Sequence, residues 1–225
     1  MPKLKPDTQI ARRTNILDAA EQCFARAGFH RTTMQDICKA AEVSPGALYL
    51  YFDSKEALIA GLAERDRAEF AERIQFLASA PDFMAALEAI GERYFAEEPA
   101  HKRLMCVEIG VEATRNPRVG EIHRSVDTFV RESFHALFQR LVDEGRIDPV
   151  LDVTALTQVF LTLGDGLFWR RAVDPSFDPK IVLPAVTQTL AGLLRPVRSG
   201  GSEVAPTGQV HQQSIDQPSE ISSCV

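Results

Sequence analysis

The chain has few cysteines and no long apolar run, and both shortages limit what it can be. Its 225 residues contain four scattered cysteines that form no CxxC pair: Cys23, Cys38, Cys106 and Cys224. This spacing does not suggest a disulfide framework or a zinc site, and it suits a reducing compartment. No apolar stretch approaches the roughly eighteen residues that a membrane span needs, and the charged N-terminal region lacks the apolar core of a signal peptide. We therefore expect a cytoplasmic protein with no membrane partner.

The short motifs of common enzymes are also missing. There is no GxSxG, no HExxH and no phosphate-cradling glycine loop. The five histidines are dispersed: His30, His101, His123, His135 and His211. We expect no enzymatic activity, no cofactor and no metal site. A metal-responsive regulator is an alternative, because His123 could meet Glu108 or Glu112 in space, although no ligand spacing within one helix supports it.

Positive charge is scarce, and what there is gathers at the N-terminal end. The formal net charge is −6, yet residues 1–55 carry eight Lys or Arg against six Asp or Glu, which leaves −8 for the remainder. A surplus of two charges is weak support by itself for nucleic-acid binding. Its value depends on the motif that the same segment contains.

Strand patterns are almost absent, whereas apolar residues recur every three or four positions nearly throughout. The first helix should span about 10–27 and end at Gly28, a favourable residue for a left-handed C-terminal cap. Thr32 and Gln35 match a capping box for a second helix that ends near Glu42. Ser44 as N-cap and Pro45 in the first turn predict a third helix of about two turns, reaching Phe52. Asp53 and Glu56 fit a capping box for a fourth helix.

Longer helical segments follow, with prolines and Gly145 between them: 81–96, 100–114, 118–144, 153–172 and 179–194. The fold class is therefore all-α, with a three-helix N-terminal head, a C-terminal helical bundle and about nine helices in total. We divide the chain into a head (1–55, with an N-terminal arm), a body (56–195) and a disordered tail (196–225), since the last segment is rich in Ser, Gly, Gln and Pro.

Two short helices joined by Glu-Val-Ser and preceded by a longer helix have the arrangement of a helix-turn-helix, whose second helix enters the major groove. From the helix pattern alone, a small structural bundle is equally consistent. A helical adaptor that does not bind DNA is therefore a second alternative.

The segment from Ile16 to Leu58, about a fifth of the chain, contains a more specific set of markers. Its first helix ends in Gly-Phe, its second starts with Thr-Thr, Ala-Ala-x-Val-Ser forms the turn, and Tyr-x-x-Phe precedes Lys-Glu. In these markers it resembles the DNA-binding domain of the TetR family of bacterial repressors. One departure is Tyr51, where the family often has His and where Tyr can still bind a phosphate. The markers stand at Gly28, Phe29, Thr32, Thr33, Ile37, Ala40, Ala41, Val43, Ser44, Tyr49, Phe52, Lys55 and Glu56.

The resemblance implies contacts with the phosphates and bases of double-stranded operator DNA. The exposed side of the third helix is sparse, because no Arg, Asn or Gln there could pair with a base through two hydrogen bonds. We assign Leu48 and Phe52 to the core and Tyr49 to the surface. The candidate DNA-binding residues are Arg12, Arg13, Thr32, Thr33, Gln35, Ser44, Pro45, Gly46, Ala47, Tyr49, Tyr51 and Lys55.

The resemblance also implies a homodimer built on the last two helices and a small effector bound inside the body. The candidate dimer residues are Leu156, Val159, Phe160, Leu163, Leu167, Ile181, Leu183, Val186, Leu190 and Leu194. An aromatic-rich set suits an apolar or aromatic effector, although each member could be plain core. That set is Phe83, Leu87, Tyr94, Met105, Glu108, Ile109, Glu112, Phe129, Phe134 and Trp169. We expect a repressor that the effector releases from DNA, with control of an efflux or detoxification operon.

Overall fold

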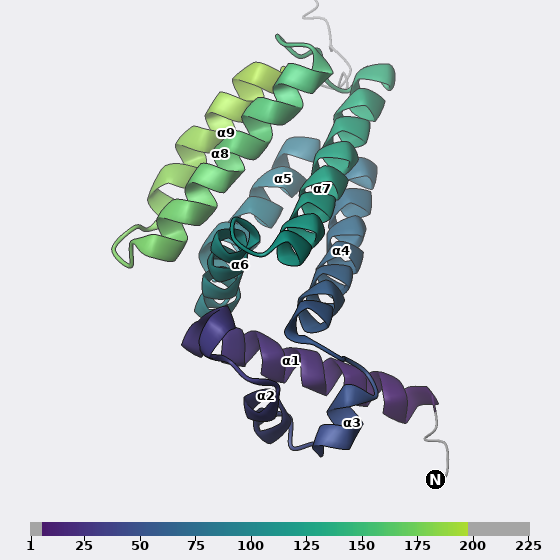
Figure 1. Cartoon of the computed structure of the whole chain (residues 1–225). Helices are drawn as coiled ribbons and strands as arrows, with labels where there is room; N and C mark the ends of the chain where they lie inside the picture. The colour runs from purple at the N-terminus through teal and green to yellow at the C-terminus, as the bar shows by residue number, and fades with distance from the viewer. Residues whose placement is uncertain (1–5, 198–225) are drawn as a thin grey trace, which may run out of the picture.

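The structure is a computed structural model that describes residues 6–197. Within them the chain forms nine α-helices and one π-helical turn (Figure 1). The bounds are α1 (Pro6–Arg31), α2 (Met34–Ala40), α3 (Pro45–Tyr49), α4 (Lys55–Ser79), α5 (Phe83–Glu92), η1 (Arg93–Glu97), α6 (Ala100–Ala113), α7 (Pro117–Asp143), α8 (Val153–Val173) and α9 (Pro179–Leu194). The all-α prediction is confirmed. None of these helices is long and apolar enough to cross a membrane.

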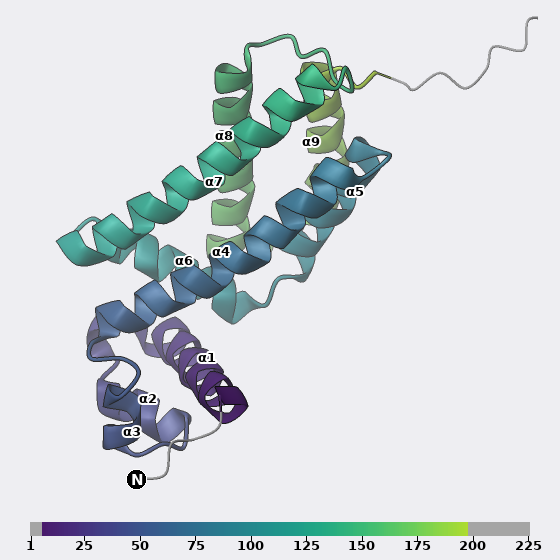
Figure 2. The ribbon, with the colours of Figure 1, turned by 90° about the vertical axis from the view of Figure 1, so that its right-hand side faces the viewer.

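The head lies at one end of the molecule and the body at the other (Figure 1). Helices α1, α2 and α3 form the head, and α4 runs from it along the body beside α7. The last two helices, α8 and α9, lie next to each other along one side (Figure 1). Turning the molecule by 90° shows α4 and α7 passing across α8 and α9 (Figure 2).

Helix α1 is longer than its apolar pattern predicted, because it begins at Pro6 rather than near residue 10. Arg12 and Arg13, two of the candidate DNA-binding residues, lie inside this helix, as the predicted range of about 10–27 already required. Near its other end, Gly28 has φ 79° and ψ 164°, which breaks the helical path before its last residues. Such a conformation strongly favours glycine, because a side chain would clash with the backbone.

Hydroxyl caps start the next three helices, but two of them differ by one residue from our prediction. Thr33, not Thr32, caps α2 and forms a capping box with Asp36. Ser44 caps α3 as predicted, with Pro45 in the first turn, yet α3 ends at Tyr49. Ser54, not Asp53, caps α4. Two neighbouring residues could have capped each of these helices, Thr32 or Thr33 for α2 and Asp53 or Ser54 for α4. In both cases the structure uses the second residue of the pair.

Two separate cores hold the molecule together. The first belongs mainly to the head, with Ile16, Phe24 and Leu48 completely buried, and it continues into the first turns of α4 through Leu58. Its buried set also includes two body residues, Met105 and Val119. The second core lies at the far end of the body, and its completely buried members include Phe138, Leu141, Leu156 and Leu194. The head is therefore fixed to α6 and α7 by shared apolar burial as well as by α4.

The chain continues beyond α9 in an ordered form for a short distance. Pro196 makes an isolated antiparallel bridge with Ile147, and the amide of Val197 donates to the carbonyl of Arg146 over 2.8 Å. The predicted disordered tail therefore starts too early, at 196, because these residues pair with the α7–α8 connection. The remainder of that tail, 198–225, lies outside the described residues.

Candidate nucleic-acid interface and effector region

The outer side of α3 is exposed and chemically sparse. Ser44, Pro45 and Gly46 are exposed at its start, and the Ser44 hydroxyl oxygen accepts a hydrogen bond from the Ala47 amide at 3.2 Å. Tyr49 is 54% exposed, whereas Leu48 is completely buried. The assignment of Leu48 and Phe52 to the core and of Tyr49 to the surface is confirmed. Small side chains next to one tyrosine let another molecule approach this helix closely.

Helix α2 adds polar side chains next to α3. Gln35 is exposed, as expected, and Lys39 is exposed one turn further along the same helix. Sequence reasoning missed Lys39, although its position four residues after Gln35 was a usable signal, since residues at that spacing share a helix face. Lys39 also lies near Asp36. Hydrogen bonds from Thr33 hold the pKa of the Asp36 carboxyl below its usual value.

Two threonines in the candidate set are occupied within the head. Thr32 is only 2% exposed, and its hydroxyl is placed to donate to the carbonyls of Gly28, at 2.8 Å, and Cys23, at 3.1 Å. The expectation that Thr32 contacts DNA is wrong for this conformation, because the hydroxyl faces the end of α1. The amide and hydroxyl of Thr33 both donate to the Asp36 carboxylate. Thr33 could reach a phosphate only by giving up that capping box.

Lys55 points into the protein rather than toward the α3 surface. Its ammonium donates to the carbonyl of Phe29 and lies 4.1 Å from the centre of the Phe29 ring. Burial lowers the pKa of this ammonium, while the carboxylates of Glu56 and Glu112 raise it. The role of Lys55 as a phosphate contact is therefore not supported. The side chain instead fixes the start of α4 to the end of α1.

The two arginines of α1 differ in what they contact. Arg13 donates to Glu64 of α4 at 2.6 Å, and its guanidinium lies 5.5 Å from the centre of the Phe52 ring. Arg12 is half-buried and has no ion pair within 4 Å in the described part of the chain. Tyr51 is also half-buried and packs against the head core. Of these three, Arg12 is the residue best placed to meet a phosphate.

The end of α1 meets two carboxylates of α6. Glu108 accepts a hydrogen bond from the Phe29 amide at 2.8 Å, and Glu112 lies 2.7 Å from the imidazole of His30. Glu112 is 3% exposed, so its carboxylate is held between the head and the body. We had predicted both glutamates as effector contacts, but each is held by the end of α1 instead. Met105 and Ile109, on the same helix, also face the head: Met105 is buried in the head core, and Ile109 packs against it.

A second ion pair connects α6 to α1 at the opposite end of α6, near its first residue. His101 of α6 lies 3.2 Å from Glu21 of α1, and Glu21 is also 3% exposed. Arg65 of α4 contacts the same carboxylate. Each end of the α1–α6 contact thus contains one buried glutamate and one exposed histidine. This junction was not predicted, because the pairs join segments about 80 residues apart.

Most of the remaining effector candidates are packed as core side chains, and Trp169 lies apart from them. Phe83, Leu87 and Phe134 pack in or against the body core. Phe129 packs edge-on against Phe70 and lines a groove between α4 and α7. Trp169 is 53% exposed on α8, so the expectation that it faces inward is wrong. The helical pattern placed Trp169 on an apolar face, but α8 has apolar residues on more than one face.

Tyr94, a predicted effector residue in η1, belongs to neither core and packs against other aromatic rings. Its ring stacks on Phe168 at 5.7 Å and meets Phe95 edge-on at 5.0 Å. Burial raises the pKa of the Tyr94 hydroxyl. Cys106 has an exposed surface, yet burial raises the pKa of its thiol to about 12.

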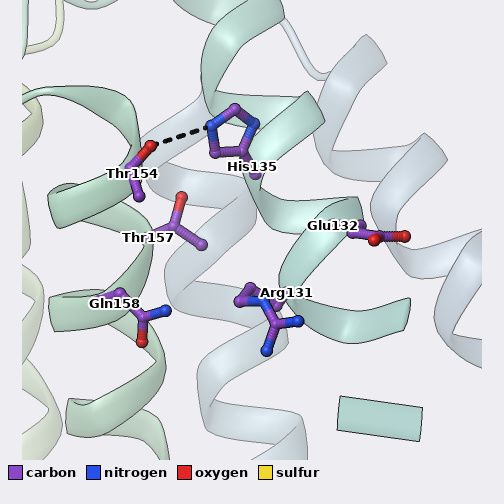
Figure 3. Close-up of a pocket in the computed structure, with 6 residues that line it drawn as sticks. All are labelled: Arg131, Glu132, His135, Thr154, Thr157 and Gln158. Atoms are coloured by element: carbon purple, nitrogen blue, oxygen red, sulfur yellow. Dashed lines mark hydrogen bonds between the residues drawn. The ribbon is translucent and has the colours of Figure 1, made fainter. Parts of the chain in front are cut away.

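A polar pocket of about 290 Å³ lies between α7 and α8 (Figure 3). Six residues line it: Arg131, Glu132, His135, Thr154, Thr157 and Gln158. His135 and Thr154 approach each other across it at 3.5 Å, whereas Glu132 points away from α8 (Figure 3). Arg131 is paired with Asp127 at 2.9 Å. None of these residues belongs to the aromatic set in which we expected an effector.

The outer face of α8 and α9 exposes large apolar side chains. Val159 is 36%, Val173 50% and Ile181 78% exposed, in addition to Trp169. The predicted dimer residues divide into three groups by exposure. Val159 and Ile181 are exposed, and four are half-buried: Phe160, Leu163, Leu183 and Val186. Four predicted dimer residues are instead buried within the chain itself: Leu156, Leu167, Leu190 and Leu194.

The histidine and glutamates of the metal hypothesis do not converge. Glu108 and Glu112 are held by Phe29 and His30, while His123 faces Asp165. In residues 6–197, no three His, Cys, Asp or Glu side chains are grouped so that they could hold a metal ion. The geometry gives the metal-responsive alternative no site to act through.

Two family models match most of the chain. Residues 16–62 match the model described as bacterial regulatory proteins, tetR family, and residues 83–195 match the C-terminal domain of the BetI-type transcriptional repressors. The HTH-type transcriptional regulator UidR of Escherichia coli strain K12 is 32% identical over 163 residues, which are 69% of this chain and 79% of UidR. YfiR of Bacillus subtilis strain 168, an uncharacterized HTH-type regulator, is 30% identical over 74% of this chain and 82% of its own length.

Solved structures are similar over the same range. Salmonella enterica GusR has a TM-score of 0.71 and 30% identity, and the match covers 86% of this chain and 100% of GusR. The fatty acid degradation regulator FadR of Bacillus halodurans has a TM-score of 0.70 and 24% identity, covering 87% of this chain and 100% of FadR. At that lower identity, the FadR likeness concerns the fold alone.

Proposed function

Since the chain belongs to the TetR family and is a DNA-binding transcriptional repressor, we propose that it binds a palindromic operator as a homodimer. A small effector bound in the body would release it. The exposed, sparse face of α3, with Tyr49 beside Ser44 and Gly46, is the observation that supports this most directly. A second helix with such a surface is able to enter the major groove.

DNA affinity in this proposal comes chiefly from contacts with phosphates. Tyr49, Arg12 and Lys39 supply them, with Lys39 in place of the inward-facing Lys55. The Ser44 hydroxyl accepts a bond from α3, so its own proton is free for a phosphate oxygen. Base contacts are few and come from Gln35 and from apolar contact with thymine methyl groups. Because one head makes few contacts with bases and phosphates, tight operator binding needs two heads.

The second copy in this proposal covers the outer face of α8 and α9. A palindromic site requires two recognition helices about 34–36 Å apart, related by a two-fold axis. The exposed apolar side chains of these helices, Val159, Trp169, Val173 and Ile181, support this face as the interface. Buried residues such as Leu156 then act indirectly, by holding α8 in place.

Effector and operator are coupled in this proposal through α6 and α4. Glu108 and Glu112 of α6 hold the end of α1, and Lys55 of α4 holds the same end. A ligand that shifts α6 relative to α4 therefore changes the placement of the head. By linkage, the operator lowers effector affinity by the same factor as the effector lowers operator affinity. Control of an efflux or detoxification operon stays a prediction.

The decisive experiment selects an operator from a random duplex library and measures its affinity by fluorescence anisotropy over a range of salt concentrations. Tyr49→Phe and Lys39→Ala should weaken binding while leaving the fold intact, since both side chains are exposed. Lys39→Ala should also lower the salt slope by about one unit, because one phosphate charge is no longer neutralised.

Lys180→Ala is the matched control, because Lys180 is an exposed lysine on α9, remote from the head. It should leave the operator affinity unchanged. Unaltered affinity and salt slope in both head variants would contradict this assignment of the DNA-binding surface.

A further inference from the structure

Arg103 is a buried cation without an anionic partner. It lies in α6, is 7% exposed, and donates from Nη1 to the carbonyl of Glu98. Its Nε atom is buried and has no hydrogen-bond partner. No carboxylate lies within ion-pair distance of it among the described residues, because that of Glu98 pairs with Lys102 at 3.4 Å. Removing a guanidinium from water in this way is unfavourable unless an anion compensates.

A second guanidinium, that of Arg171 on α8, lies close enough to act on the charge of the first. Burial lowers the pKa of Arg103, and the positive charge of Arg171 lowers it further. Arg171 donates from Nη1 to the carbonyl of Phe177 at 3.2 Å, but its Nε atom is also buried without a partner. The described residues place no carboxylate in ion-pair contact with Arg171 either. Two like charges are thus held near each other, and neither has an ion-pair partner among the described residues.

The start of α6 adds to this positive potential. Pro99 occupies the N-cap position, and no side chain caps the helix. The free amides of a helix N-terminus attract anions, and the effect decays within the first turn. Arg103 lies in the second turn of the same helix, next to this end.

An aromatic surface borders the two arginines. Phe168 precedes Arg171 by three residues, so the two side chains share a face of α8. Phe168 stacks on Tyr94 of η1. Arg171 therefore shares its face of α8 with a stacked aromatic pair, Tyr94 and Phe168.

We propose that Arg103 and Arg171 bind the acidic group of an anionic effector, a carboxylate or a phosphate, whose apolar part lies against Tyr94 and Phe168. This assignment rests on the proposed function, because it names the chemistry of the ligand that the body takes. Guanidinium groups suit both anions, since their planar donors match two oxygens at once. The ligand is thus an amphipathic anion rather than a neutral or cationic aromatic compound.

The test uses the full chain without DNA and three probes of nearly one shape: phenylacetate, phenyl phosphate and the neutral phenylacetamide. Isothermal calorimetry measures their affinities for the wild type and for Arg171→Gln. We expect at least one anion to bind the wild type about tenfold or more tightly than the amide, as charge-assisted hydrogen bonds allow. Arg171→Gln should remove most of that preference, and Arg171→Lys should keep part of it. The anion that binds more tightly identifies the acidic group.

Arg170→Gln is the matched control, since Arg170 is the exposed neighbour whose guanidinium lies over the Phe177 ring. It should keep the full preference for the anion. Arg103→Gln gives a second variant, and circular dichroism checks its fold; if it does not fold, Arg171→Gln decides alone.

Three results would overturn the proposal: equal affinity for the acids and the amide, no binding of either acid, or undiminished preference in Arg171→Gln. These results concern ligand binding alone and leave operator binding intact. Loss of the proposed function would appear separately, as a wild type that binds anions but no operator.

Discussion

Helices α1 and α8 are both long, at 26 and 21 residues, but they distribute their apolar side chains differently. The central apolar residues of α1, such as Ile16 and Phe24, are completely buried on one side of the helix. Helix α8 buries Leu156 in the same way, yet leaves Val159 and Trp169 exposed on another side. The core around α1 is complete within one chain. Helix α8 has an apolar face left over, which is the physical basis for the proposed second copy.

The polar groups repeat this contrast. At the end of α1, the carboxylates of Glu108 and Glu112 meet an amide and an imidazole of the head. Near the end of α8, the guanidinium of Arg171 acts on that of Arg103, and neither has a carboxylate partner in the described structure. Charges that are paired stabilise a single arrangement. A buried charge without a partner in the chain favours binding of a ligand of opposite charge.

The largest effect should come from removing a ring from the core around α1. Phe24→Ala should lower the free energy of unfolding by about 3–5 kcal/mol, because Phe24 is 0% exposed and a cavity would remain. Chemical denaturation followed by circular dichroism measures the change. Phe76→Ala is the control, since Phe76 is 56% exposed on α4 and its loss should change stability by less than about 0.5 kcal/mol. Equal losses in both variants would contradict the described head core.

The fold was largely predictable because local signals and helix periods agreed. Pro99, Pro117 and Pro179 mark the starts of helices that the apolar pattern also predicted. The errors concern where elements begin and end. The pattern could not choose between Thr32 and Thr33, or between Asp53 and Ser54, because neighbouring residues were equally able to cap. Packing of the helix against its neighbours decides such cases, and that information is not local.

The site was less predictable, since a motif fixes a position in the chain but not the direction of a side chain. Tyr49 and Lys55 both belong to the markers, yet Tyr49 is exposed and Lys55 lies on Phe29. Glu108 and Glu112 were named from the sequence as effector candidates, but they hold the end of α1 instead. Their partners, Phe29 and His30, come from a distant segment of the chain, so no local pattern could identify them.

Gly28→Ala should give the next largest effect, and it examines why α1 ends as it does. Gly28 has φ +79°, and an added Cβ would lie 2.8 Å from Oε1 of Glu108. The strained backbone should cost about 1–3 kcal/mol in unfolding free energy. Gly145→Ala is the control for backbone strain, because φ is +66° there and nothing lies within 4 Å of the added Cβ. A smaller loss at Gly28 than at Gly145 would show that Glu108 does not restrict this position.

Glu112→Gln should have a smaller effect and examines the junction between head and body. The change keeps the shape of the side chain but removes the charge that faces His30, at 2.7 Å, and Lys55. We expect a loss of about 0.5–1.5 kcal/mol in unfolding free energy, since His30 is largely exposed. Glu121→Gln, at an exposed position of α7, should change stability very little. No difference between the two variants would mean that the junction does not depend on this charge.

The smallest effect on folding should come from Trp169→Ala, which examines the leftover face of α8. Because Trp169 is 53% exposed, its removal should change the unfolding free energy of the isolated chain by less than about 0.5 kcal/mol. In the proposed dimer the same ring lies in the interface, where tryptophans often contribute most to affinity. Trp169→Ala should therefore shift the chain toward monomers in sedimentation velocity, at concentrations where the wild type is dimeric.

Leu167→Ala, two residues earlier on α8, separates this explanation from general damage to the helix. Leu167 is 8% exposed, so its truncation should lower the unfolding free energy by about 2–5 kcal/mol. Trp169→Ala should show the opposite pattern, with the fold intact and association weakened. If Trp169→Ala left association unchanged while Val159→Asp, on the same exposed face, also left it unchanged, the apolar surface of α8 would not be the interface. The contrast between α1 and α8 would then reflect tolerance of exposed apolar residues and not a second copy.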